Sequence, residues 1–351
     1  MKFTRRALLS TALAGLSLTT MPRLVNAAGG PILHASWGGG VGSTWRDAFA
    51  GPYAETGSDV RVVEVPNPEA QLRAQAGAPQ YHSAICTFVQ ANNLMKDGLV
   101  ETFDPDELPE MKNVDKKYWL TTPDGKLAGV TPYFAYYGIA VNTNEAKVED
   151  FQSWKSLGEA RWKGRLGLTR PIYLSTYDLT IMSKAMGGDE FNIDGGMSLL
   201  RDTAKNILSV TTSLAQQNAV LERGEVAAMP FYSVRVWSLQ SAGVDYVKMV
   251  IPEEGALLLP YVIVAPKGVA DREMTRQWLN YIASGAPQER GATLSGYIPA
   301  NEAAKASTEI ESRLGGSFSD LRQKLYQPDW NHIADHQKER VEEIDKMLAD
   351  L

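Results

Sequence analysis

Short apolar runs and amphipathic stretches alternate along the chain from residue 31 onward. The apolar runs predict strands, whereas the amphipathic stretches predict helices. A repeated strand–helix–strand order predicts a mainly parallel sheet with helices on both faces. The expected strands cover residues 32–35, 60–65 and 83–88, and the expected helices cover residues 44–56, 69–76 and 90–98.

The pattern changes at residues 131–142, a long run of strand-forming residues, and a second α/β series begins after it. Neither a repeat nor a low-complexity linker separates the two series, so we expect an α/β protein of two lobes joined by long shared strands. The residues from 302 onward should be mostly helical and should close with a helix at 341–351. The other expected strands cover residues 165–168, 227–232, 247–251 and 257–264, and the other expected helices cover residues 177–186 and 197–205.

The first residues have the three parts of a secretory signal peptide. A basic pair, Arg5-Arg6, precedes an apolar run at residues 7–16, and Val25-Asn26-Ala27 offers a small-residue cleavage site. The apolar run is shorter than the roughly 20 residues that a spanning helix needs. We expect residues 1–27 to be removed on export to the periplasm, by either the twin-arginine or the general secretory route.

The charge balance argues against nucleic acid or an anionic membrane surface as a partner. Without residues 1–27 the chain carries 31 basic and 41 acidic residues, a net charge of −10, and such a surface repels polyanions. The single cysteine, Cys86, cannot form an internal disulfide, and its strand-like surroundings predict a buried thiol. We expect a monomer.

A glycine-rich loop, SWGGGVGSTW, joins the first expected strand to the first helix. Gly38-x-Gly40 matches the first two glycines of a dinucleotide-binding fingerprint, but Ser43 stands at the third position. Glu64, at the end of the next strand, resembles the acid that holds a ribose in such sites. An exported Rossmann-type oxidoreductase is therefore one alternative, whereas the absence of a following Gly-Lys-Ser/Thr excludes a P-loop.

Catalytic motifs are otherwise missing. There is no Gly-x-Ser-x-Gly elbow. His332 and His336 are spaced to share a metal, but no further ligand pattern surrounds them, which favours a solvated helix face. We therefore expect no metal, no cofactor and no enzymatic activity.

Many aromatic residues fall near the carboxyl ends of expected strands, where ligands of α/β proteins bind. Their rings give a pocket a large and stiff contact area, although core packing is the alternative for each of them. These aromatic residues are Trp37, Trp45, Tyr133, Tyr136, Tyr137, Tyr173, Tyr177, Phe231, Tyr232, Trp237, Tyr261 and Tyr297.

Six short motifs occur in order through most of the chain. They are SWKSL at 153–157, RWKGRL at 161–166, GEVAA at 224–228, PEEGA at 252–256, VIVAPKG at 262–268 and GYIPAN at 296–301. Together they resemble the extracellular solute-binding proteins of ABC importers, in the branch that includes spermidine/putrescine and ferric-iron binders.

This resemblance implies the two-lobed fold of a type II periplasmic binding protein, which closes over a small solute and delivers it to an ABC permease in the inner membrane. It also implies that the glycine-rich loop faces the ligand. The expected hinge is formed by the strands at 132–142 and 257–264. The expected lobes are residues 28–136 with 257–315, and residues 137–256 with 316–351.

The departures from the family pattern bear on the ligand. Polyamine-binding relatives carry acids where Thr169-Arg170-Pro171 stands here, and an aromatic residue and an Asp where Leu259-Pro260-Tyr261 stands. A dication would lose the carboxylates that hold its ammonium groups. The tyrosine pair of iron binders is not recognisable, since Tyr136-Tyr137 falls in the shared strand. A polyamine-binding protein of the same family is kept as an alternative.

Two arginines instead predict a ligand with an anionic group, such as a carboxylate, phosphonate or sulfonate. The planar guanidinium of Arg170 can donate two parallel hydrogen bonds to one oxyanion, and the Gly38–Gly40 amides could complete a clamp from the other lobe. For Arg235 a surface ion pair is an equally good interpretation. The expected ligand-binding residues are Trp37, Gly38, Gly39, Gly40, Thr87, Phe88, Tyr133, Arg170, Tyr173, Tyr232, Arg235 and Tyr261.

Overall fold

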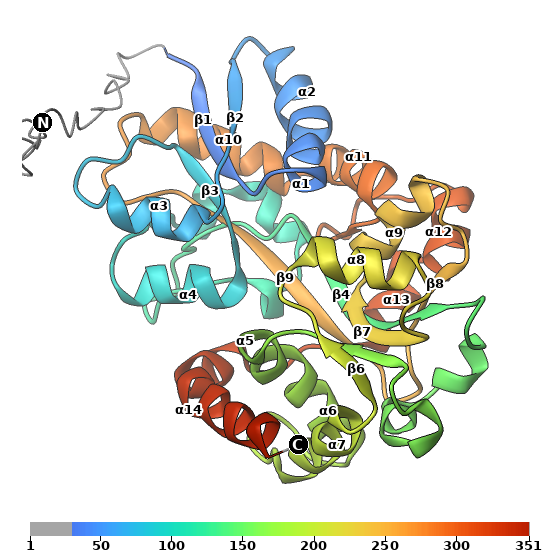
Figure 1. The fold of residues 1–351 in the computed structure, drawn as a ribbon. Coiled ribbons are helices and arrows are strands. Elements are labelled where there is room, and N and C mark those ends of the chain that lie inside the picture. Colours follow the sequence, from blue (N-terminus) through green and yellow to red (C-terminus); the bar gives the residue numbers. More distant parts are fainter. Residues whose placement is uncertain (1–29, 351) are drawn as a thin grey trace, which may run out of the picture.

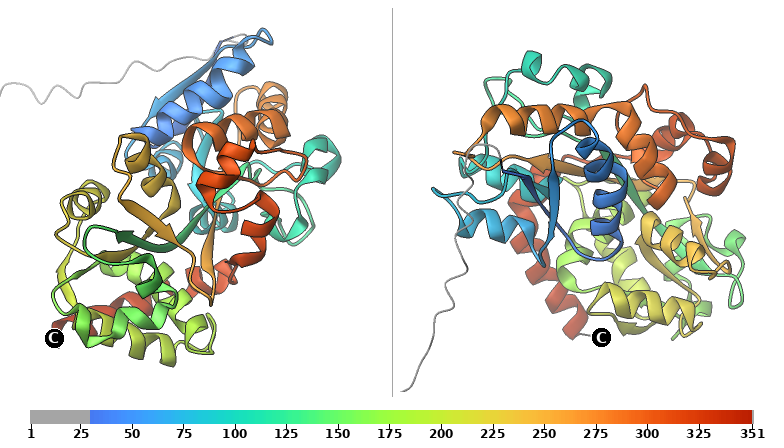
Figure 2. Two further views of the ribbon diagram at one scale, coloured as in Figure 1. Left: turned by 90° about the vertical axis from the view of Figure 1, so that its right-hand side faces the viewer. Right: turned by 90° about the horizontal axis from the view of Figure 1, so that it is seen from above.

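The computed structural model describes residues 30–350, so the predicted signal peptide lies outside the described residues. Two α/β lobes share one sheet of eleven strands, with helices on both of its faces (Figures 1 and 2). None of the helices from residue 30 to residue 350 is long and apolar enough to cross a membrane.

The strand order across the sheet is β2-β1-β3-β9-β4-β7-β5-β6, with β8 and β10 also pairing with β4, and β11 pairing with β9. Neighbours β1, β2 and β3 are parallel, and so are β5, β6 and β7. The strands are β1 (Ile32–Ser36), β2 (Val60–Glu64), β3 (Ser83–Thr87), β4 (Tyr133–Asn142), β5 (Leu166–Leu168), β6 (Ile207–Val210), β7 (Ala228–Tyr232), β8 (Val247–Val250), β9 (Ala256–Val264), β10 (Ile298–Pro299) and β11 (Leu325–Tyr326).

Helices follow most strands and cover the sheet. Two of the helical stretches are continuous but contain π-helical turns, at Trp45–Ala50 and Leu174–Asp178. The α-helices are α1 (Gly40–Thr44), α2 (Gly51–Ala54), α3 (Pro68–Ala74), α4 (Phe88–Lys96), α5 (Pro171–Tyr173), α6 (Leu179–Ala185), α7 (Asp194–Ala204), α8 (Leu214–Glu222), α9 (Ser233–Ser241), α10 (Arg272–Ala283), α11 (Gly285–Ser295), α12 (Thr308–Leu314), α13 (Phe318–Lys324) and α14 (Trp330–Ala349). Short 3₁₀ turns lie at Pro105–Glu107, Pro109–Asn113, Lys116–Tyr118, Val148–Phe151, Trp154–Gly158 and Ala160–Trp162.

The two long strands β4 and β9 connect the lobes. β9 is antiparallel to β3 along Tyr261–Val264 and antiparallel to β4 along Leu257–Pro260, so it passes from one half of the sheet to the other (Figure 1). β4 pairs with β10 at its start and with β7 and β8 towards its end. The sequence prediction of long strands shared by two lobes is therefore confirmed. We call the half containing β1–β3 the first lobe and the half containing β5–β7 the second lobe.

The core of the first lobe forms around an aromatic cluster next to β1. The indole of Trp45 lies 4.1 Å from the His34 ring and 4.4 Å from Phe49, ring centre to ring centre. His34 is fully buried, its Nδ1 lies 2.8 Å from the Ser83 hydroxyl, and burial lowers its pKa to about 3. This histidine is therefore a neutral structural residue. Cys86, on the adjacent β3, is fully buried as expected, and burial raises the pKa of its thiol.

Two of the sequence motifs are in contact in the second lobe. The Glu254 carboxylate accepts hydrogen bonds from the Ser153 hydroxyl at 2.5 Å and from the Trp154 amide at 3.2 Å. The buried Trp154 indole donates to the Gly255 carbonyl at 2.8 Å. The SWKSL and PEEGA motifs thus hold the start of β9 against the second lobe, and their role is structural.

Candidate functional site

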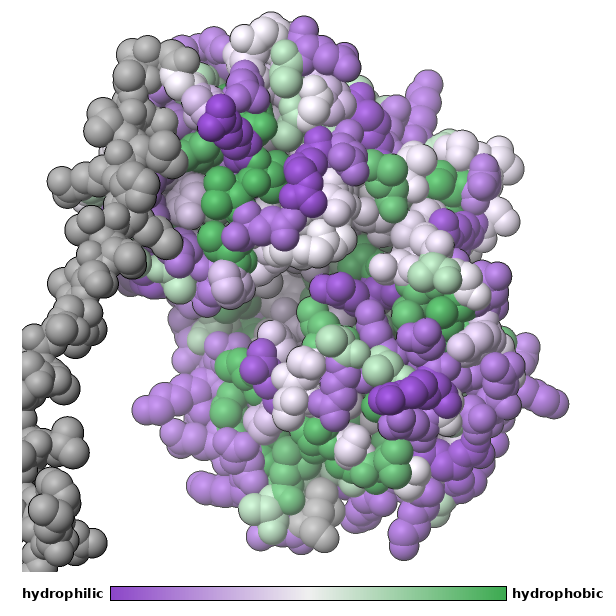
Figure 3. Space-filling view, turned by 45° about the horizontal axis from the view of Figure 1, so that its top comes forward, coloured by the Kyte–Doolittle hydropathy of each residue, from purple (hydrophilic) through white to green (hydrophobic). Residues whose placement is uncertain are grey.

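A cleft of about 1040 Å³ lies between the lobes, at the carboxyl ends of β1, β3, β5 and β7. The space-filling view shows the molecule hollowed between its upper and lower parts (Figure 3). Loops at the ends of parallel strands meet at one edge of a sheet, which is why residues far apart in the sequence gather here.

Nine of the twelve expected ligand-binding residues line this cleft: Trp37, Gly38, Gly40, Thr87, Arg170, Tyr173, Tyr232, Arg235 and Tyr261. Phe88 borders a small adjoining cavity instead. Tyr133 is fully buried beneath the cleft, where its ring stacks on Tyr297 at 4.0 Å, so its predicted contact with the ligand is wrong. Gly39 belongs to the same loop, but its amide points to a protein side chain.

That side chain is Glu64, which fills the glycine-rich loop. Its carboxylate accepts a hydrogen bond from the Gly39 amide at 3.3 Å and pairs with Arg46 at 2.5 Å. A Cβ atom at Gly38 or Gly42 would lie 2.7 Å or 2.4 Å from this carboxylate, so a side chain at either position would displace Glu64. Arg46 also lowers the pKa of Glu64, and the carboxylate is ionised.

Glu64 therefore corrects two predictions. It occupies the position that a pyrophosphate would need in a dinucleotide site, and its oxygens face the loop rather than a ribose. The Gly39 amide, assigned to a ligand anion from the sequence, donates to Glu64 instead. The expected helix after the loop also begins earlier than predicted, at Gly40 rather than at residue 44.

Arg170 and Arg235 lie on the second-lobe wall of the cleft. Arg170 follows β5, donates to the Tyr173 hydroxyl at 3.1 Å and lies over the Tyr173 ring at 4.9 Å. Arg235, on α9, is half-buried, and its guanidinium makes no hydrogen bond or ion pair with any residue between 30 and 350. The alternative of a surface ion pair for Arg235 is therefore not what the structure shows.

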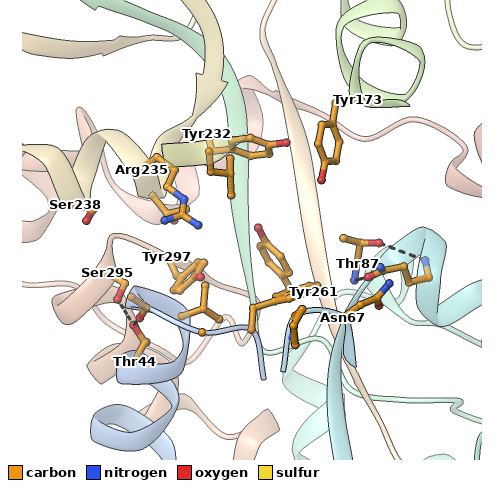
Figure 4. A pocket seen from close by; sticks show the side chains of 18 of the residues that line it. Thr44, Asn67, Thr87, Tyr173, Tyr232, Arg235, Ser238, Tyr261, Ser295 and Tyr297 are labelled. Atoms are coloured by element: carbon orange, nitrogen blue, oxygen red, sulfur yellow. Dashed lines mark hydrogen bonds between the residues drawn. The ribbon is translucent and has the colours of Figure 1, made fainter. Parts of the chain in front are cut away.

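Tyrosines surround the Arg235 guanidinium. Figure 4 shows Arg235, Tyr232 and Tyr261 directed towards the same open space. Burial raises the pKa of Tyr261 to about 12, an effect that the Arg235 charge partly offsets, and burial raises the pKa of Tyr232 further. Both phenols are thus neutral hydrogen-bond donors. Trp37 meets the Tyr261 ring edge-on at 5.9 Å and forms the first-lobe side of this group.

Three further aromatic residues line the cleft, namely Tyr177, Trp237 and Tyr297, which the sequence placed among the candidate aromatics but not in the site. By contrast, Trp45, Tyr136, Tyr137 and Phe231 are buried in the core, as the packing alternative proposed. A position near a strand end therefore separates cleft residues from core residues only in part. Tyr136 and Tyr137 lie inside β4, where the neighbouring strands β7 and β9 and the packed helices bury them.

Thr87 was predicted as a ligand-binding residue, whereas the polar lining residues Asn67 and Gln90, which also lie at helix starts, were missed. Asn67 caps α3 and Thr87 caps α4, and the Thr87 cap is closed by the Gln90 side chain in a capping box. Capping signals predict a helix start, which at a strand end also places the residue in the cleft. Gln337 of α14 reaches the cleft and donates to Thr176 at 2.7 Å.

Comparison with known proteins now identifies the family. Residues 45–314 match the family described as bacterial extracellular solute-binding protein. The chain belongs to this family. It is 25% identical, over 265 residues, to spermidine/putrescine-binding periplasmic protein 1 of Haemophilus influenzae, covering 73% of this chain and 72% of that protein.

Solved structures of such proteins share the fold. An ABC transporter substrate-binding protein from Bradyrhizobium japonicum superposes with a TM-score of 0.77 at 18% identity, covering 91% of this chain and 99% of that one. The periplasmic binding protein AfuA from Actinobacillus pleuropneumoniae, with fructose-6-phosphate bound, superposes with a TM-score of 0.70 at 17% identity, covering 91% and 98%. The predicted two-lobed fold is confirmed, and the chain is an extracellular solute-binding protein rather than a Rossmann-type oxidoreductase.

Proposed function

We propose that this protein captures a small solute with an anionic group in the inter-lobe cleft and delivers it to an ABC permease of the inner membrane. The observation that carries the proposal is the half-buried Arg235 guanidinium, which faces the cleft without an acidic partner among residues 30–350. A cation held this way gains a strong, directional interaction when a carboxylate or phosphoryl group arrives.

A polyamine fits this wall poorly. Its ammonium groups would meet two guanidiniums, and repulsion between like charges in a partly dehydrated cleft costs binding energy. The acids that line the cleft, Asp47 and Glu69, lie on the first lobe, and Glu69 already pairs with Arg73 at 3.0 Å. The sugar phosphate bound in the AfuA structure supports an anion in this fold, although AfuA shares only 17% of its sequence with this chain.

We further propose that the protein acts in the periplasm as a monomer without catalytic turnover. Closure would then rotate the lobes about β4 and β9, with lobe boundaries close to residues 136/137, 256/257 and 315/316. Both strands are paired along their whole length and run between two packed lobes, which favours rotation of rigid bodies over internal rearrangement.

The test is a thermal-shift screen of the mature protein against a metabolite library, followed by calorimetry with the best compound. Arg235→Ala should weaken binding by about 2–5 kcal/mol, because a buried ligand charge is left unpaired. Arg201→Ala is a matched control, since Arg201 is exposed on α7 and does not line the cleft. A screen whose best compounds are polyamines, or an unchanged affinity in Arg235→Ala, would contradict the proposal.

A further inference from the structure

The positive charge of the cleft comes from two neighbouring strands. Arg170 follows β5 and Arg235 lies in the first turn after β7, and these two strands pair in parallel. The carboxyl ends of paired parallel strands lie at the same edge of the sheet. Both guanidiniums therefore belong to one wall of the cleft, the wall formed by the second lobe.

Neither guanidinium is neutralised by the protein. Among the described residues, no carboxylate lies within ion-pair distance of the exposed Arg170 side chain, whose hydrogen bond goes to the Tyr173 hydroxyl, or of Arg235. The chain as a whole has 41 acidic against 35 basic residues, so an arginine without an acid partner is not a consequence of composition. The wall keeps two positive charges available to whatever binds.

Neutral donors accompany these charges. The hydroxyls of Tyr232 and Tyr261 make no hydrogen bond with any described residue, and both side chains face the cleft near Arg235 (Figure 4). Phenols whose pKa is raised by burial keep their protons and donate to anions. Two guanidiniums and two phenols supply donors for more oxygens than a single carboxylate presents.

We propose that the solute is a dianion whose two negative charges are matched by Arg170 and Arg235. This inference rests on the proposed function and narrows it. When the lobes close, a monoanion would leave one guanidinium dehydrated and unpaired, which is unfavourable, whereas a dianion pairs both. The two charges can sit on one group, as in a phosphate monoester or phosphonate, or on two groups, as in a dicarboxylate.

The experiment compares matched probes by thermal shift and calorimetry on the mature protein. The panel holds phosphate monoesters such as fructose 6-phosphate, alkylphosphonates and dicarboxylates from succinate to adipate. Each is paired with a neutral or monoanionic analogue, such as fructose or pentanoate, and putrescine represents dications. We expect at least one dianion to bind more than tenfold more tightly than its matched monoanion.

Two variants test which residues recognise the charges of the solute. In Arg170→Gln and in Arg235→Gln, the preference for the dianion over its monoanionic analogue should fall from more than tenfold to about onefold. Arg201→Gln should leave that preference unchanged, and melting curves without ligand will show that each variant is folded. A preference that survives either cleft substitution overturns the assignment of the two charges.

The pH dependence separates the two kinds of dianion. The second ionisation of a phosphate monoester has a pKa near 6, so its affinity should fall about tenfold per pH unit below that value. A dicarboxylate should keep its affinity to a lower pH, since its second carboxyl group ionises at about pH 5.5, after the first has become charged. If no dianion in the panel binds, or if monoanions bind equally well, the proposal of a dianionic solute is wrong, while the broader proposal of an anionic solute stands. Dications as the best ligands would refute both.

Discussion

Asp178 is a buried carboxyl group whose ionisation should make the stability of the second lobe depend on pH. It is fully buried at the end of the π-helical turn before α6, and its Oδ2 accepts a hydrogen bond from the Tyr137 hydroxyl at 3.0 Å. Its Oδ1 has no partner among the described residues. Burial raises its pKa to about 8, which the Tyr137 hydrogen bond offsets only in part. The other titratable group facing it is the phenol of Tyr232, which stays neutral.

The direction of the effect follows from linkage. The folded state holds the Asp178 proton up to about pH 8, whereas the unfolded chain releases it near pH 4. This contribution to stability is fully present below about pH 4, and it decreases as pH rises through the window up to about pH 8. One pKa unit corresponds to about 1.4 kcal/mol, so the loss between pH 5 and pH 8 is at most about 4 kcal/mol.

Asp178→Asn tests this reasoning because asparagine has the same shape and cannot ionise. Urea unfolding at pH 5, 6, 7 and 8 should show the wild type losing stability relative to the variant by roughly 1 kcal/mol per pH unit. Asp106→Asn, an exposed acid in a 3₁₀ turn, is the control and should run parallel to the wild type. A wild-type-minus-variant difference that does not change with pH would refute the assignment of the pKa to burial.

Three other features give shorter predictions. The Arg313 guanidinium lies 3.6 Å above the Trp237 ring and donates to the Trp237 carbonyl at 2.9 Å. Arg313→Ala should therefore lower the unfolding free energy by about 1–2 kcal/mol in urea titrations. An unchanged unfolding free energy would show that this contact does not stabilise the protein. Cys86 should not react with an aromatic disulfide reagent until the chain is unfolded, since the native thiol is fully buried; rapid native reaction would contradict this. X-ray scattering should give a smaller radius of gyration once the solute found by screening is bound, and superimposable curves would exclude rotation about β4 and β9.

The sequence predicted most of the strands, whereas it missed the helices between residues 207 and 300. Strands β1, β3, β7 and β9 fall within one or two residues of the expected ranges, because each is a short apolar run bounded by polar residues. Helix α10 was missed although Met274, Trp278 and Ile282 recur every four residues along it, which is a readable signal. Edge strand β6 was missed for a physical reason, since Leu208 points to solvent and the pattern of a buried strand is lost.

The charged residues of the candidate site could be predicted from the sequence. Which aromatic rings are exposed in the cleft and which are buried beneath it could not. Arg170 was predicted from its place after an expected strand and from its departure from the polyamine-binder pattern. Tyr133 was placed in the cleft because it begins a strand at the correct edge, but Tyr261 and Tyr297 lie over it at 5.6 Å and 4.0 Å. Which of several stacked rings is outermost depends on packing between segments far apart in the chain, and no local pattern records it.

Glu64 explains why the anion selection that we propose rests on the second-lobe wall of the cleft. The same sequence features, a glycine-rich loop and an acid at the end of the next strand, suit a dinucleotide site and suit the loop seen here. In the structure the Glu64 carboxylate uses the Gly39 amide, and Arg46 neutralises Glu64 at 2.5 Å, so the first lobe adds no net positive charge at this loop. We propose that charge recognition rests on the second lobe, since Glu64 takes the Gly39 amide that the sequence assigned to the ligand and Trp37 lines the first-lobe side of the cleft. Trp37 presents a ring and no charge. Substitution of Arg170 or Arg235 should therefore change how affinity depends on the ligand's charge, and substitution of Trp37 should change how affinity depends on its apolar part.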